Sequence, residues 1–201
     1  MRLPEWYDPD RDLLLTPSRL RGLVHPLRMK LLQLLQEDGP ATATSLAARI
    51  GQSSGVTSYH LRVLGEHGFI EEDAERGNGR DRWWRAVHRS TAFTFRMPED
   101  PGDAQSVEDA ERFVRMDADE MYQRMVAFIE TLAARRAELA ELPWQLSYWP
   151  VRLTREEARE LAAQVNALVQ PYRRAQGDPD PRQGTERAYF QFQLLPDERP
   201  E

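Results

Sequence analysis

Residues 51–70, GQSSGVTSYHLRVLGEHGFI, begin as a polar turn, continue as a short helical pattern and stop at a glycine before an apolar pair. Ser53 or Ser54 is the predicted N-cap, because a serine side chain accepts a backbone N–H at a helix start. Gly68 is predicted to close the helix. The segment is too short for a coiled coil, and its centre is too polar for a fully buried helix.

Two faces of this helix carry different side chains. The positions predicted to face the core recur at helical spacing; they are Thr57, Leu61 and Leu64. The opposite face presents groups that donate or accept hydrogen bonds; they are Ser58, Tyr59 and Arg62. His60 lies nearer the buried edge, so a core or phosphate-contacting histidine is favoured over one that reads bases.

The residues before this stretch also predict helices. Leucines recur at helical spacing within residues 18–38. Pro26 suits the first turn of a new helix, and His25 suits the extended backbone that precedes a proline. We therefore expect a short helix before His25 and a longer one that runs to Asp38 and is capped by Gly39.

A further short helix is predicted within residues 40–51, PATATSLAARIG. Thr44 is its predicted N-cap, and Gly51 is predicted to end it. Its apolar stripe consists of Leu46, Ala47 and Ile50.

The residues after residue 68 predict a β-hairpin. Segments 69–75 and 82–87 alternate or are rich in aromatics, and a glycine-rich turn at 77–79 separates them. Trp83 and Trp84 point to opposite faces of the returning strand, so at least one belongs to the core. Three arginines surround the tip and the returning strand: Arg76, Arg80 and Arg82.

This order of helices followed by a hairpin is that of a winged helix-turn-helix, whose second helix of the pair enters the major groove of DNA. The residues predicted to contact double-stranded DNA are Thr44, Ser54, Ser58, Tyr59, His60, Arg62, Arg76, Arg80 and Arg82. The wing arginines are expected to reach phosphates or an adjacent minor groove and to position the protein rather than read bases. Three alternatives stay open. The winged helix could bind a protein instead of DNA, Tyr59 could pack on its own helix instead of contacting DNA, and the wing arginines could belong to a solvated turn.

The stretches HPLRMKLLQLL, ATSLAARIG, SSGVTSYHLRVLGEHGFIEE and GRDRWWRAV occur in this order and resemble the ArsR-type winged-helix transcription regulators. The resemblance covers residues 18–90. It implies a dimeric bacterial repressor that binds a palindromic operator and leaves it when an inducer arrives. By position, the family's recognition-helix contacts to DNA correspond to Ser58, Tyr59, His60 and Arg62.

The chain departs from the metal-sensing members of that family, which use cysteines near the recognition helix or Asp, His and Glu on a C-terminal dimer helix. It has no cysteine and no histidine beyond His88. Three acids of its long helix are interpreted as solvated; they are Asp117, Asp119 and Glu120. Because transition metals favour imidazole or thiolate ligands, we expect no metal site and no cofactor.

Residues 97–142 are predicted as a linker and a long helix from Ser106 to Leu142 that dimerises the chain. Its apolar face consists of Val107, Phe113, Val114, Met121, Met125, Phe128, Ile129 and Leu132. A two-fold dimer would space two recognition helices about 34 Å apart, one turn of DNA. The alternative is a helix packed within its own chain.

Residues 143–201 are predicted as a strand–helix–strand unit, with strands near 144–153 and 186–196 and a capping box formed by Thr154 and Glu157. Its aromatics allow two interpretations. One is a pocket for a small apolar effector, lined by Trp144, Tyr148, Trp149 and Tyr172. The other, which we favour, is that they are core and interface residues.

The expected fold class is therefore mainly α with small β. An N-terminal arm over residues 1–17 precedes a winged-helix domain over residues 18–96. Residues 18–90 hold eleven basic and eight acidic side chains, against fourteen and twenty-one in residues 91–201. A weakly basic region of this kind can bind phosphate although the net charge of the chain is −6.

Composition and motifs narrow the remaining function classes. The chain lacks cysteine, a signal-peptide core and an apolar run of membrane-helix length, so we expect a cytoplasmic protein, nucleoid-associated when bound to DNA and without membrane contact. We expect no enzyme, because there is no phosphate-binding glycine loop, metal-ligand set or nucleophile motif. The adjacent acids at 71–73 lie on the wing strand, where alternation splits their directions.

Overall fold

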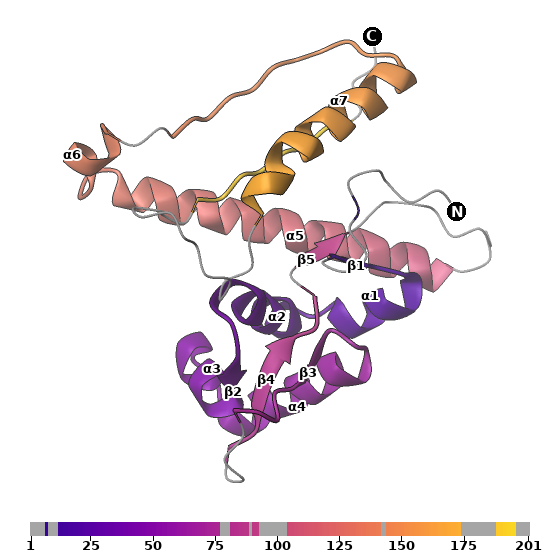
Figure 1. Ribbon diagram of the computed structural model, residues 1–201, viewed down its shortest axis with the longest axis vertical. Helices are drawn as coiled ribbons and strands as arrows, with labels where there is room; N and C mark the ends of the chain where they lie inside the picture. Colours follow the sequence, from indigo (N-terminus) through magenta and orange to yellow (C-terminus); the bar gives the residue numbers. More distant parts are fainter. Residues whose placement is uncertain are drawn as a thin grey trace. The chain divides into compact units, whose positions relative to one another are not determined.

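The computed structural model of the chain describes residue 7 and residues 12–76, 81–88, 90–92, 104–141, 144–173 and 188–195 (Figure 1). It divides the chain into two units. The first comprises residues 9–148, and the second comprises residues 1–8 and 149–201.

The first unit is mainly helical with small sheets, as the sequence predicts. Its helices are α1 (Pro17–Leu23), α2 (Pro26–Asp38), α3 (Ala43–Ile50), α4 (Ser54–Glu66), α5 (Ala104–Thr131) and α6 (Arg136–Leu139). Its strands are β1 (Asp12–Leu14), β2 (Ala41–Thr42), β3 (Ile70–Glu72), β4 (Trp83–Ala86) and β5 (Ser90–Ala92). Antiparallel pairing joins β2 to β4 and β4 to β3, so the wing hairpin is confirmed.

The predicted break between α1 and α2 is confirmed. His25 is extended, with φ −161°, and its Nδ1 accepts the backbone N–H of Leu27 at 3.2 Å. Pro26 then opens α2, since proline lacks the N–H that the first helical turn leaves unpaired. Gly39 has φ 83°, a conformation that favours glycine, and it follows the last residue of α2.

The predicted N-cap of α3 is wrong. Thr42 and not Thr44 caps it, and its hydroxyl accepts the backbone N–H of Ser45 at 3.1 Å. The Ser45 hydroxyl in turn accepts the backbone N–H of Thr42 at 3.1 Å. The pairing of β2 with β4 carries the chain to Thr42 in an extended conformation, so the helix starts two residues earlier than the local pattern indicates.

One apolar core holds these elements together. Its fully buried members come from α2, α3, α4 and the step into β3; they are Leu31, Leu46, Leu61, Leu64, Phe69 and Ile70. Trp84 of β4 is 9% exposed and belongs to the core, whereas Trp83 on the other face of the strand is half-buried. The predicted division of the two tryptophans is therefore confirmed.

Residues 12–15 also pack into this core, although the sequence assigned them to an N-terminal arm. β1 pairs in parallel with β5, and Leu13 and Leu15 are buried. Asp12 is completely buried and accepts a hydrogen bond from the Ser90 hydroxyl. Burying an aspartate is costly without such a partner, so this bond fixes the register of the two strands.

The long helix α5 is shorter than predicted, because it ends at Thr131 and not at Leu142. The Thr131 hydroxyl donates to the carbonyl of Phe128 at 2.7 Å, and the N–H of Leu132 bonds to Ile129, three residues back. A side chain that competes for the carbonyls and a tightened last turn both favour termination. A turn then leads into the short helix α6.

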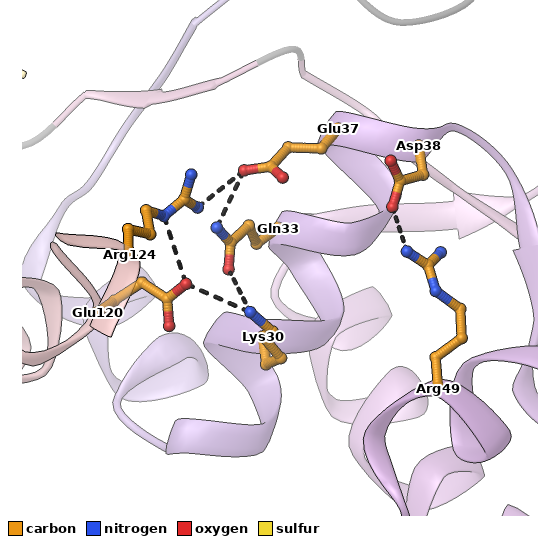
Figure 2. A network of polar contacts seen from close by, with 7 residues as sticks. All are labelled: Lys30, Gln33, Glu37, Asp38, Arg49, Glu120 and Arg124. Carbon is orange, nitrogen blue, oxygen red and sulfur yellow. Dashed lines mark hydrogen bonds and ion pairs between the residues drawn. The ribbon is translucent and has the colours of Figure 1, made fainter. Parts of the chain in front are cut away.

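Ion pairs join α5 to the winged helix (Figure 2). Arg124 bonds to Glu37 of α2 at 2.8 Å and to Glu120 at 3.4 Å. Glu120 also pairs with Lys30 of α2 at 3.3 Å. At the end of α2, Asp38 pairs with Arg49 of α3. Glu120, predicted to be solvated, thus helps to fasten α5 to α2.

The second unit contains α7 (Arg155–Val169) and the 3₁₀ turn η1 (Gln170–Tyr172). The predicted capping box is confirmed: the Thr154 hydroxyl accepts the N–H of Glu157 at 3.2 Å, and the Glu157 carboxylate accepts the N–H of Thr154 at 2.7 Å. The predicted flanking strands are absent from the described residues. Segments 144–153 and 188–195 carry no regular structure, and the strand pairs of the described residues include neither segment.

Candidate nucleic-acid interface

Helix α4 separates an apolar face from a polar one. Thr57, Leu61 and Leu64 are at most 1% exposed, as the sequence predicts. On the opposite side Tyr59 is 55% exposed, and Ser54 and Arg62 are exposed as well, with Ser58 half-buried. The hydroxyl of Ser53 accepts the N–H of Val56 at 3.3 Å and starts the helix. The polar face of α4 is therefore open to a ligand.

His60 lies inside the unit. It is 7% exposed, and its ring centroid lies 4.3 Å from that of His25. Burial lowers the pKa of His60, and the neighbouring His25 and Arg28 lower it further. A buried neutral ring cannot enter a groove of DNA, so the structure supports the core interpretation of His60.

A hollow of about 280 Å³ lies between the start of α3, the polar face of α4 and the wing. Its lining consists of Thr42, Ala43, Thr44, Ser58, Arg62, Asp81, Arg82 and Trp84. Thr44, which does not cap α3 as predicted, is exposed at the edge of this hollow. The hollow thus brings together four of the residues predicted to contact DNA: Thr44, Ser58, Arg62 and Arg82.

The wing arginines that the structure describes are paired with acids. Arg76 lies 3.4 Å from Asp73 and over the ring of Trp83. Arg82 lies 3.1 Å from Glu72 and over the ring of Trp84. Arg80 falls outside the described residues. Because exposed ion pairs are worth about 0–1 kcal/mol, a phosphate can still replace the acid, but it must compete with it.

The acids that pair with these arginines come from the run at 71–73, and Glu71 and Glu72 lie on the wing strand β3, as the sequence predicts. The strand register places Glu71 opposite Arg85 and Glu72 opposite Trp84, beside Arg82. Cross-strand charge pairing is predictable once a register is known, but the turn did not define that register from sequence alone.

Arg62 differs from the other arginines around it. Among the described arginines of α3, α4 and the wing, each of the others has an acidic partner: Arg49, Arg76, Arg82 and Arg85. No acid within the part of the chain that the structure describes pairs with Arg62. Its guanidinium, with five donors and no acceptor to bind, is therefore available to a base edge or a phosphate.

The proposed effector aromatics lie on the surface. Trp144 is 51% exposed, packs against Phe128 at 5.4 Å between ring centroids, and donates its indole N–H to the Leu139 carbonyl at 3.1 Å. Tyr148, Trp149 and Tyr172 are 71–83% exposed. Trp144 and Tyr148 belong to the first unit and the other two to the second.

Two further features bear on the function class. Within the described ranges, no three His, Asp or Glu side chains lie close enough to hold a metal ion. In the same ranges, no helix combines the length and the apolar character needed to cross a membrane.

Comparisons with known proteins match the winged-helix part of the chain. A family model described as a helix-turn-helix domain covers residues 23–73. The crystal structure of a possible transcriptional regulator for arsenical resistance is 30% identical in sequence over 54% of this chain and 93% of that protein, with a TM-score of 0.31. Residues 23–73 of the chain therefore contain a helix-turn-helix domain.

Two further solved structures, with lower sequence identity, are similar to this chain. A homodimeric winged helix-turn-helix DNA-binding domain from Mycobacterium bovis, a possible ArsR-family regulator, is 21% identical over 53% of this chain and 82% of its own, with a TM-score of 0.32. ZitR from Lactococcus lactis, solved as a double mutant in the apo form, is 13% identical over 77% of this chain and 88% of its own, with a TM-score of 0.33. No curated protein matches the chain.

Proposed function

We propose that this DNA-binding regulator reads a palindromic operator as a homodimer and represses transcription by occupying it. The observation that carries the proposal is the polar face of α4, where Arg62 stands exposed without an acidic partner among the described residues. Ser58 and Arg62 line the hollow beside it, and Tyr59 projects from the same face. A helix that presents such donors fits the major groove, whose base edges are read by hydrogen bonds.

The outer face of α5 supports the dimer. Val114, Tyr122 and Ile129 are 45%, 65% and 54% exposed and recur on one side of the helix. The adjoining side is fastened to the winged helix through Ala110 and Phe113, both buried, and through the ion pairs of Arg124. An apolar stripe on a helix already anchored to its own chain suits a second copy, and two copies supply the symmetry of a palindrome.

We extend the proposal to release by a non-metal effector. The observation that supports it is that Tyr148 in the first unit and, separately, Trp149 and Tyr172 in the second are exposed, since indole and phenol groups suit an apolar ligand with a polar handle. Loss of operator binding on adding zinc or nickel would contradict this part of the proposal.

The direct test is fluorescence anisotropy of the full chain on its own upstream intergenic DNA, with excess competitor DNA. Saturable binding at nanomolar concentration is expected, together with a steep loss of affinity as salt rises. Arg62→Ala should weaken operator binding by about 1–3 kcal/mol, the range for a base contact. Arg115→Ala, which removes an exposed arginine of α5, is the matched control and should leave affinity unchanged.

Two outcomes would contradict the proposal. If Arg62→Ala binds like the native chain, α4 does not read DNA through this residue. If binding is weak and abolished by competitor DNA, the chain does not read an operator in that DNA, and a protein-binding winged helix becomes the better interpretation.

A further inference from the structure

Helix α5 is attached to the winged helix in two ways that differ along its length. Its buried residues all lie near its start; they are Ser106, Asp109, Ala110 and Phe113. From residue 114 to residue 131 no residue of α5 is buried within its own chain. Apolar packing therefore fixes the position of the start of α5, and a second attachment is needed to fix the direction in which the helix runs.

That second attachment is a closed network of polar contacts between α2 and α5 (Figure 2). Glu37 accepts hydrogen bonds from Arg124 at 2.8 Å and from Gln33 at 2.9 Å. Lys30 donates to Gln33 at 3.5 Å and to Glu120 at 3.3 Å. Glu120 also pairs with Arg124 at 3.4 Å, which closes the network. Each of the five side chains of this α2–α5 network thus has two partners within it.

Helical spacing explains why these five side chains meet. Lys30, Gln33 and Glu37 lie three and four residues apart on one face of α2, and Glu120 and Arg124 lie four apart on α5. The two positive and two negative charges cancel. Isolated surface ion pairs contribute little, whereas several charges joined in a network can define a geometry. The side chain of Arg124 is only 22% exposed, and its planar group bonds to carboxylates of both helices, so it joins them in one orientation.

The α2–α5 network lies at the level of α5 where a second copy is proposed to dock. Tyr122, the most exposed member of the apolar stripe of α5, lies between Glu120 and Arg124 in the sequence. At about 1.5 Å of rise per residue, Arg124 lies about 16 Å along the helix from the buried Phe113. The angle of the winged helix to an axis near Tyr122 therefore depends on whether the network is intact.

We propose that Glu37 and Arg124 are positioning residues that fix the angle between the winged helix and α5. They thereby set the spacing at which two copies read the two halves of an operator. Base pairs follow one another at about 3.4 Å, so a shift of this size in one recognition helix changes the matching spacing by one base pair. This inference rests on the proposed homodimer that reads a palindrome, and it adds the residues that decide which spacing the dimer accepts.

The first test needs no DNA. The chain has no cysteine, so spin labels can be attached to Gln52→Cys before α4 and to Glu130→Cys near the end of α5, both at exposed positions. Mixing with excess unlabelled chain restricts the measured distance to one copy. Pulsed electron paramagnetic resonance should give one narrow distance for the otherwise native chain. Arg124→Met, which removes the charge and keeps an unbranched side chain, should replace it with a broad distribution.

The second test uses the inverted repeat that the native chain selects from random duplex DNA. Duplexes with the spacer changed by one or two base pairs, and a duplex with a single half-site, are titrated by fluorescence anisotropy. The native chain should prefer the selected spacing by about tenfold, because a wrong spacing displaces one half-site from its reader. Arg124→Met should lower that preference to about threefold or less while its affinity for the single half-site stays within about twofold of native.

Arg112→Met is the matched control. It removes an exposed arginine of α5 that pairs with Glu108 of the same helix at 2.8 Å, so it changes the net charge equally without touching α2. It should keep both the narrow distance and the spacing preference. Glu37→Gln breaks the network from α2 and should reproduce Arg124→Met, and combining the two changes should add little, because both residues belong to one network. Circular dichroism melting checks that each variant is folded.

Three results would overturn the inference. The first is a folded Arg124→Met variant that keeps the narrow distance. The second is equal weakening on the single half-site and on the inverted repeat, which indicates damage to base reading. The third is dissociation of the folded variant into monomers in sedimentation, which would place Arg124 in the dimer interface.

Failure of this inference is separable from failure of the proposed function. If the native chain selects no inverted repeat, the proposed function is rejected, and the distance measurement alone decides whether the α2–α5 network positions the winged helix. If the native chain and Arg124→Met share the same spacing preference, the proposed function stands and this inference is wrong.

Discussion

The two units place similar apolar side chains in opposite environments. In the first, Leu61 and Leu64 are fully buried between helices; in the second, Leu168 and Phe190 are 72% and 65% exposed. Both units have well-formed helices with capped starts, so local propensity does not separate them. The difference lies in long-range packing, and it teaches that a good helix does not show that its surroundings form a complete core.

Core truncation should give the largest contrast between the units. Leu61→Ala is expected to cost about 2–5 kcal/mol of unfolding free energy, because it removes buried methyl groups and leaves a cavity. Leu168→Ala, measured at a concentration where the chain is monomeric, should change stability by less than about 0.5 kcal/mol. Urea unfolding followed by circular dichroism measures both. Equal costs would show that the second unit has a core within one chain.

A glycine in α1 tests how tightly the first unit is packed. A Cβ added at Gly22 would lie 2.3 Å from Cγ of His67, which follows α4. Gly22→Ala should therefore destabilise the chain by about 1–3 kcal/mol, reduced by the better helix propensity of alanine. Gly55→Ala in α4, where an added Cβ meets nothing within 4 Å, is the control and should raise the melting temperature. Equal shifts for both variants would contradict the packing argument.

Lowering the pH should reduce the free energy of unfolding of the first unit, which contains all the histidines of the chain. Burial, first among the causes, lowers the pKa values of His25, His60 and His88 below their ordinary value. The unfolded chain then binds more protons between those lowered pKa values and about 6.5, so stability falls as the pH drops through this window and is level above it.

Urea unfolding between pH 7.5 and 5.5 measures this dependence. His60→Leu removes one of the titrating groups and should flatten the slope of stability against pH. An unchanged slope would show that His60 does not contribute. The cap of α7 contains no histidine, so its helical signal should be insensitive over the same range.

The sequence predicted most of what local chemistry decides. Proline and glycine positions located the ends of α1, α2 and α3, and the spacing of Thr57, Leu61 and Leu64 oriented α4. It misplaced the cap of α3, because the start of that helix depends on the pairing of β2 with β4, in which Ala41 lies opposite Trp84, 43 residues further along the chain. It also predicted strands in the second unit, since alternation shows strand propensity but not the partner that a strand needs.

The candidate site shows the same division. The outward face of α4 follows from helical periodicity alone, and there the predicted Ser54, Tyr59 and Arg62 are exposed. Whether the wing arginines are paired does not follow from periodicity. Arg82, for example, is paired because the fold brings Glu72 beside it from the neighbouring strand. A sequence lists charges, whereas their availability to a phosphate depends on which opposite charges the fold brings beside them.

The wing ion pair gives the smallest predicted effect. Glu72→Gln releases Arg82 from its partner at 3.1 Å and removes a negative charge that repels phosphate. Operator affinity should therefore rise by a factor of about two to five, in keeping with a surface pair worth up to about 1 kcal/mol. Glu156→Gln is the control in the second unit: it breaks an ion pair of similar length with Arg159, at 2.8 Å, and should leave affinity unchanged. Anisotropy at low salt, where screening is weakest, gives the best resolution. If Glu72→Gln instead weakens binding, the ion pair must hold Arg82 in the orientation that DNA needs. Glu72 would then orient Arg82 for DNA rather than compete with phosphate for it.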